Sequence, residues 1–261
     1  MRRGTSFAAA GVLFVLAILA WQFWVTAFHV PHYILPGPAR VVADLWRERA
    51  LFAGNVTVTV FETLAGLAGG IACGAAAALI VHRWVLARRA LYPWLVASQT
   101  IPIIIIAPIL TFWFGYGLLP KVLVAGLFAF FPVTVGLLDG LRGVDREYVE
   151  VLRTLGAGEA TLFRHVLLPG ALPSFFSGLR LAAAYSVIGA ITGEWVGSAA
   201  GLGYVALRAR TQFLTDRMFA SVVVTAVIGI ALFLLVGRLE RRLTPWRFSP
   251  GTRRETSGKD V

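Results

Sequence analysis

The sequence is poor in charge, cysteine and histidine. Only 14% of its 261 residues are charged, against about 25% in soluble globular domains. A single cysteine, Cys73, excludes a disulfide within the chain. The four histidines, His29, His32, His82 and His165, are scattered along the sequence, a pattern that forms neither a metal site nor a histidine-based catalytic set. We therefore expect no metal, no cofactor and no catalytic residues.

Two further absences restrict the reactions that this chain itself could catalyse. No GxxxxGK[ST] phosphate loop occurs, so any ATP hydrolysis linked to this chain must take place on another subunit. No clustered nucleophile or acid–base pair is visible either, which argues against an enzyme embedded in the membrane. What the sequence has in abundance is apolar residues, at 58% of the chain.

Long hydrophobic runs dominate the chain, and mean hydropathy is +0.77. Runs near or above about 18 residues are long enough to cross a bilayer. We predict an all-α integral membrane protein with six transmembrane helices, at about 7–28, 56–81, 92–114, 121–139, 175–197 and 218–237. With the N-terminus inside, most Lys and Arg residues fall in the inner segments, so both termini are expected in the cytoplasm. This topology explains the net charge of +11 without nucleic-acid binding.

The chain divides into three parts by composition. Residues 1–55 hold the first span and an outer segment with a short amphipathic stretch at 39–46. The first span ends in Trp21, Phe23 and Trp24 rather than in a small-residue cleavage site, which indicates a retained helix. Residues 56–240 are expected to form one helical membrane domain. Residues 241–261 are a polar tail, predicted to be disordered from residue 244 onward.

Two spans carry local signals. The second span has Gly66, Gly70 and Gly74 on one helix face, which lets another helix approach closely in lipid. The third span contains Pro102 and Pro108. Prolines there indicate kinks or breaks, tolerated where protein or a cavity covers the freed carbonyls. Structural bending and a substrate path are both compatible with this pattern.

Acidic residues inside or near spans are expensive and suggest function. Glu194, next to Trp195 at the outer end of the fifth span, is the main candidate, and Glu62 in the second span follows. One interpretation is a substrate path or gate. The other is a satisfied packing residue, with Glu194 paired to Arg208 or Arg210.

The segment 150–169, EVLRTLGAGEATLFRHVLLP, is too polar to cross lipid. A helix from 145 to 155 is expected to stop at Gly156, where glycine permits the left-handed backbone of a sharp turn. A second short helix is expected at about 158–167, with Pro169 and Pro173 ending it and helping to start the next span. It would project from the membrane as an apolar knob suited to a groove on a partner, formed by Ala157, Leu162, Phe163 and Val166. The alternative is that Leu162 and Phe163 pack back on the membrane domain.

The spacing of Glu150, Gly156, Val166 and Leu168-Pro169 closely resembles the cytoplasmic EAA loop of ABC-importer permeases. Val151-Leu152 depart from it, since the family usually has two alanines there. Further segments are similar to the nitrate/sulfonate/taurine branch: 33–38, 102–115 (PIIIIAPILTFWFG), 131–132, 178–180 and 193–195. Residues 114–121 and 215–217 look similar to members that handle a thiamine-precursor pyrimidine.

The resemblance implies the permease subunit of an ATP-driven importer in the cytoplasmic (inner) membrane, moving a small organic solute. A secondary transporter without an ATPase is the alternative. The family implies a permease homodimer, two copies of a cytoplasmic ATP-binding subunit and a periplasmic or lipid-anchored solute-binding protein. The ATPase would dock on a coupling-helix loop formed by Glu150, Arg153, Gly156, Ala157, Leu162, Phe163, Val166 and Pro169. The substrate pathway or gate would involve Pro102, Pro108, Glu194 and Trp195. No strongly cationic cage for an anion is visible, which favours a thiamine-precursor pyrimidine over taurine, another sulfonate or nitrate.

Overall fold

The computed structural model describes residues 2–98 and 100–248, and every regular element within them is a helix. Four helical stretches are long and apolar enough to cross a membrane: α3 (Arg49–Arg83), α6 (Leu118–Arg142), Glu159–Gly197, and α11 (Thr215–Leu243). The apolar part of α1, Gly11–Ala27, and α5 (Ile103–Phe114) are shorter. The all-α membrane architecture is confirmed, while the number of six spans stays a prediction. The division at 55/56 and 240/241 also stays a prediction, and both points lie inside helices, α3 and α11.

Helices α3 and α6 lie in close contact along the predicted glycine face. A methyl group added at Gly66 would come within 2.4 Å of the Ala125 Cβ atom. One added at Gly70 would come within 2.6 Å of the Ala129 Cβ atom. The absence of side chains on α3 therefore sets the distance between the two helices, as small residues do in lipid. The prediction of close helix packing is confirmed.

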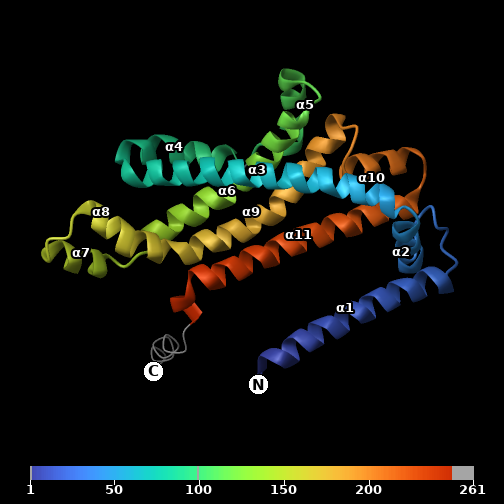
Figure 1. Cartoon of the computed structure of the whole chain (residues 1–261), viewed down its shortest axis with the longest axis horizontal. Helices are drawn as coiled ribbons and strands as arrows, with labels where there is room; N and C mark the ends of the chain where they lie inside the picture. The colour runs from blue at the N-terminus through green and yellow to red at the C-terminus, as the bar shows by residue number, and fades with distance from the viewer. Residues whose placement is uncertain (1, 99, 249–261) are drawn as a thin grey trace.

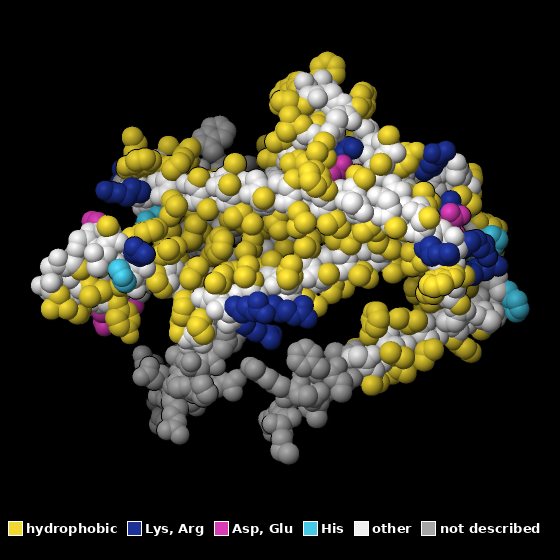
Figure 2. Space-filling model, in the orientation of Figure 1, with side chains coloured by type: hydrophobic (Ala, Val, Ile, Leu, Met, Phe, Trp, Pro, Cys, Tyr) yellow, Lys and Arg dark blue, Asp and Glu magenta, His cyan; other side chains and the backbone are white. Residues whose placement is uncertain are grey.

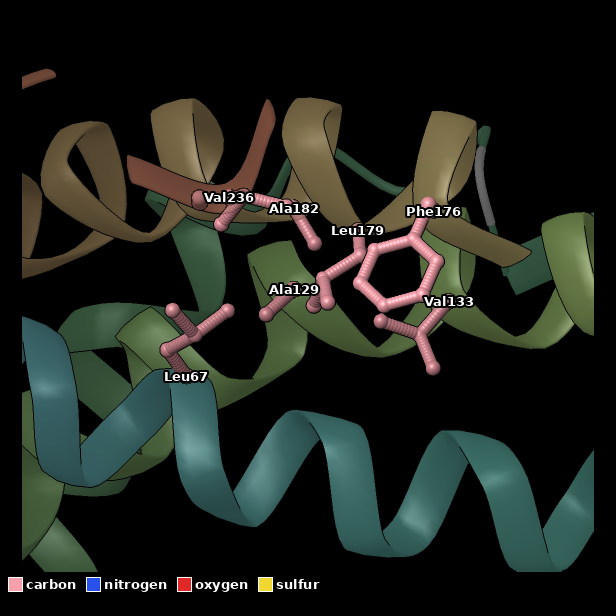
Figure 3. Packing of buried hydrophobic residues seen from close by; sticks show 8 residues of the cluster. Leu67, Ala129, Val133, Phe176, Leu179, Ala182 and Val236 are labelled. Carbon is pink, nitrogen blue, oxygen red and sulfur yellow. The ribbon is translucent and has the colours of Figure 1, made fainter. Parts of the chain in front are cut away.

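The core of the bundle forms where α3, α6 and α11 meet α9 (Leu168–Gly197) (Figure 1). Side chains from all four helices interdigitate there, as Figure 3 shows for Leu67, Ala129, Val133, Phe176, Leu179, Ala182 and Val236. Because lipid tails are as apolar as these side chains, van der Waals packing rather than water exclusion holds the helices together.

The predicted third span is broken into two helices. Helix α4 (Val85–Ser98) precedes α5, and Pro102 is the N-cap residue of α5. Pro108 lies inside α5 without ending it. Figure 1 shows α5 projecting away from the bundle, with Phe112 and Trp113 among its exposed side chains. The expected break is therefore found at Pro102 but not at Pro108.

The N-terminal helices join the bundle at one end. Near that end Trp21 of α1 (Arg2–Ala27) contacts Phe219 of α11, with ring centres 6.1 Å apart, and the rest of α1 runs away from the long helices in Figure 1. Helix α1 is joined to α2 (Pro38–Arg47) by a 3.2 Å hydrogen bond from the Ala39 N–H to Gln22 Oε1. Helix α2 matches the amphipathic stretch expected at 39–46, and its Val41 is buried in a cluster with Ala220 of α11. The apolar face of α2 is therefore covered by other helices of the same chain.

The region after the last span is ordered further than predicted. After α11 a short 3₁₀ helix, η2, covers Pro245–Phe248. Glu240 is fully buried and forms ion pairs with Arg180 of α9 and with Arg247, the latter at 2.7 Å. The prediction of disorder from residue 244 is wrong up to residue 248, because this ion pair ties the segment back to the bundle. The rest of the predicted tail, 249–261, lies outside the described residues.

Candidate functional site

The predicted docking loop begins with α7 (Arg146–Thr154). The Asp145 Oδ1 atom caps this helix by accepting a 3.0 Å hydrogen bond from the Glu147 N–H. Gly156 then turns the chain with φ +84°, the left-handed conformation that side chains oppose. The Ala157 N–H closes the turn by donating to the Leu152 carbonyl at 3.0 Å. The prediction of a glycine turn at this position is confirmed.

The second helix of the loop runs on into the membrane. Helix α8 (Glu159–Leu162) is followed by a π-helical turn, η1 (Phe163–Leu167), and then directly by α9. The prediction that Pro169 ends this helix is wrong. Pro169 falls in the first turn of α9, where a missing N–H is tolerated, and the π turn lets the Leu168 N–H reach the Phe163 carbonyl. The second part of the loop is therefore continuous with a spanning helix.

The side chains of α8 and η1 do not project as predicted. Leu162 is only 1% exposed. Phe163 is partly buried against the cluster that Leu137, Leu138 and Ala171 form with α3. The expectation that these two form an exposed knob is wrong, since both pack back on the membrane domain.

Helix α7 provides the free apolar surface instead. Its exposed apolar side chains include Tyr148 at 68% and Val151 at 58%, and Leu155 follows its last turn at 76%. Their i, i+3, i+7 spacing is the signal in the sequence that could have identified this face. Arg153 and Glu159 face each other across the turn in a 2.8 Å ion pair.

Glu194 lies in a buried polar cluster where α3, α6 and α9 meet α10 (Leu202–Thr211). Thr59 Oγ1 donates a 2.6 Å hydrogen bond to its carboxylate, and the Gly203 N–H donates to the other oxygen. Glu194 therefore caps the first turn of α10. The expected pairing with Arg208 or Arg210 is wrong for Arg208, which bonds to the Tyr204 hydroxyl, and no ion pair joins Glu194 to Arg210 among the described residues.

Glu62 belongs to the same cluster. Its carboxylate lies 3.3 Å from the Lys121 ammonium group of α6, and Lys121 also donates a 2.7 Å hydrogen bond to Ser198 Oγ. These contacts favour the interpretation of Glu62 and Glu194 as packing residues that join helices. The described residues contain no group of three His, Cys, Asp or Glu side chains arranged to hold a metal.

A groove of about 810 Å³ lies between the start of α5, α6 and α9. Of the four predicted pathway residues, only Pro102 lines it. Pro108 is exposed on α5, and Glu194 is buried in the polar cluster. Trp195 borders a smaller cavity of about 230 Å³ between α9, α10 and α11. The structure does not bring these four residues together.

Apart from Pro102, the residues that line the groove were not predicted from the sequence. Aromatic and polar side chains stand out in it: Phe128, Phe131, Asp139, Ser174, Ser177 and Tyr185. They recur at helical spacing on one face each of α6 and α9, so a search for a shared face could have found them. Among the described residues that line the groove, Asp139 alone is charged.

Comparisons with known proteins agree with this architecture. Residues 70–245 match the family model described as binding-protein-dependent transport system inner membrane component. The formylaminopyrimidine transport permease protein ThiX of Halalkalibacterium halodurans is 39% identical over 95% of this chain and 99% of its own length. The riboflavin transport system permease protein RibX of Chloroflexus aurantiacus is 37% identical, with coverage of 91% and 90%. The taurine transport system permease protein TauC of Escherichia coli is 29% identical, with coverage of 88% and 87%.

Among solved structures, an inward-facing MetNI methionine ABC transporter has a similar fold. The TM-score is 0.64 at 19% identity, covering 76% of this chain and 98% of that one. At this identity the likeness concerns the fold.

Proposed function

The chain belongs to the family of binding-protein-dependent transport system inner membrane components and is the permease subunit of an ABC importer for a small solute; on this premise we propose that its solute is an uncharged aminopyrimidine of the thiamine-precursor kind. The observation that supports this proposal is the lining of the groove between α5, α6 and α9.

The groove offers the contacts that a flat nitrogen heterocycle needs. Phe128, Phe131 and Tyr185 provide aromatic faces for stacking. Ser177 and Asp139 provide oxygen acceptors for amino and formylamino N–H groups. The described residues that line the groove include no Lys, Arg or His, so a sulfonate or nitrate ion would enter without a compensating cation. The similarity to the formylaminopyrimidine permease points the same way.

Uptake assays test the proposal directly. Cells that express the complete importer should take up labelled formylaminopyrimidine saturably, and unlabelled taurine or nitrate should not compete. Saturable taurine or nitrate uptake without pyrimidine uptake would overturn the substrate assignment and leave the permease role intact.

The ATPase is proposed to dock on the loop from α7 to η1. Two copies of a separate cytoplasmic ATP-binding subunit would each take one loop, contacting Glu150, Arg153, Gly156, Ala157 and the exposed Val151 and Leu155. Leu162, Phe163, Val166 and Pro169 would support the loop from behind, since Leu162 and Phe163 pack on the bundle. In this arrangement the exposed apolar face of α7 would contact the ATPase.

The proposed homodimer follows from the presence of one docking loop in each permease chain. A two-fold homodimer would present two docking loops to two ATPases, and a periplasmic or lipid-anchored solute-binding protein would deliver the solute from outside. Figure 2 shows hydrophobic side chains over the middle of the visible face, with basic ones at both ends and in a group along its lower edge. Together with the positive-inside bias, this supports a multi-pass protein of the cytoplasmic membrane with both termini in the cytoplasm.

A further inference from the structure

A second cavity, of about 470 Å³, lies beside the docking loop and is rich in arginine. Its charged lining consists of Arg88 from α4, Arg142 at the end of α6, and Arg146, Glu150 and Arg153 from α7. Figure 2 shows basic side chains at this end of the molecule, near α4 and α8. Three separate elements thus bring cations around one space.

Most of these cations lack an acidic partner. Arg153 is paired with Glu159, whereas no ion pair between described residues involves Arg88, Arg142 or Arg146. Of the residues that the structure describes in this lining, Glu150 alone is acidic. Since like charges around one space repel each other, an anion in the cavity would be stabilised.

The cavity also lies at the end of α6, a helix long and apolar enough to cross a membrane. Arg142 is the last residue of the spanning helix α6, and its guanidinium group lies 5.1 Å from the centre of the Tyr92 ring. Aromatic and basic residues at a helix end are typical of the headgroup region. The other walls are apolar and include Leu141, Val144 and Leu167. A ligand that carries a phosphate next to a hydrocarbon chain would contact both the basic and the apolar walls of the cavity.

We propose that this cavity binds the headgroup phosphate of an anionic phospholipid such as phosphatidylglycerol. Basic pockets between transmembrane helices on the cytoplasmic side are suited to such headgroups. The bound phosphate would connect α4 and α6 to α7, and so hold the docking loop in position from the lipid side. Free phosphate shares the same chemistry but leaves the apolar walls uncovered.

The test compares two triple variants of the full-length permease in complex with its ATPase. Arg88→Gln/Arg142→Gln/Arg146→Gln removes the three unpaired cavity arginines. Arg238→Gln/Arg241→Gln/Arg242→Gln removes three arginines from the end of α11 and is the matched control. Native mass spectrometry and titration in nanodiscs would measure binding of phosphatidylglycerol, phosphatidylcholine and inorganic phosphate.

We expect the wild type and the control to retain phosphatidylglycerol in preference to phosphatidylcholine. The cavity variant should bind phosphatidylglycerol on the order of a hundredfold more weakly, and the corresponding triple Arg→Lys variant should recover most of the binding. Equal lipid binding by the two Gln variants, with both still in complex with the ATPase, overturns the proposal. So does inorganic phosphate that binds as tightly as the lipid. If the cavity variant loses the ATPase in phosphatidylcholine alone while the wild type retains it there, the proposal is also overturned, because the arginines would then contact the ATPase directly.

Discussion

Thr59 and Glu194 lie 135 residues apart in the sequence and meet in a buried 2.6 Å hydrogen bond. The same Thr59 hydroxyl accepts a 2.8 Å hydrogen bond from the Leu202 N–H, at the first residue of α10. One side chain of α3 therefore connects α9 to α10. Helix α10 follows α9 after a short turn, and this connection helps to hold it against the bundle.

Replacing Thr59 by Val should destabilise the protein. The methyl group preserves the shape, but the Leu202 N–H and one oxygen of Glu194 lose a partner while buried. The expected loss is about 1–3 kcal/mol, measured as a lower unfolding midpoint in detergent. Thr57→Val is the control, because the Thr57 hydroxyl bonds only to the Ala53 carbonyl of its own helix and is exposed. Equal effects of the two changes would contradict the role given to Thr59.

A double-mutant cycle should detect the Glu62–Lys121 pair. Glu62→Gln leaves the buried ammonium group of Lys121 without its carboxylate, which costs about 3–5 kcal/mol. Glu62→Gln combined with Lys121→Met should cost less than Glu62→Gln alone, because no charge is left unpaired. The coupling energy is obtained from the free energies of unfolding of the wild type, the single variants Glu62→Gln and Lys121→Met, and the double variant. Additive effects would show that the 3.3 Å contact contributes nothing.

Gly156→Ala should disturb the docking loop, while Gly158→Ala should not. A methyl group meets no atom within 4 Å at either position, but only Gly156 has a positive φ, of +84°. The left-handed conformation costs an alanine about 1–2 kcal/mol. We therefore expect weaker ATPase co-purification for Gly156→Ala alone. Equal retention of the ATPase by the two variants would show that the turn does not depend on this conformation.

Local chemistry made part of the structure predictable. The glycine face of α3, the break at Pro102 and the turn at Gly156 follow from what those residues do to the backbone nearby. The errors come from long-range contacts. The burial of Leu162 depends on α8 and η1 lying against the bundle, and the partner of Glu194 is on a helix far away in the sequence. The groove was predictable as two helix faces, but only the tertiary arrangement makes them face one another.

Leu155→Asp is expected to detach the ATPase without unfolding the permease. Leu155 is 76% exposed, so a charge there remains solvated in the free chain but would be desolvated in an apolar contact. Co-purification of the ATPase should fall, while the amount of permease in the membrane stays unchanged. Thr154→Asp, at an exposed neighbouring position, controls for added charge. Normal ATPase retention by Leu155→Asp would remove the α7 face from the docking surface.

Asp139 gives the sharpest test of the solute. If its carboxylate accepts a hydrogen bond from an amino group of the pyrimidine, Asp139→Asn should lower uptake at limiting solute concentration. A hydrogen bond to a charged group contributes about 1.5–3 kcal/mol, which corresponds to about 10- to 150-fold. ATPase co-purification should not change, because Asp139 lines the groove rather than the docking loop. Asp139→Lys should abolish pyrimidine uptake and reduce discrimination against taurine, since it introduces the cation that the groove lacks. Unchanged pyrimidine uptake in both variants would mean that the solute does not contact this carboxylate.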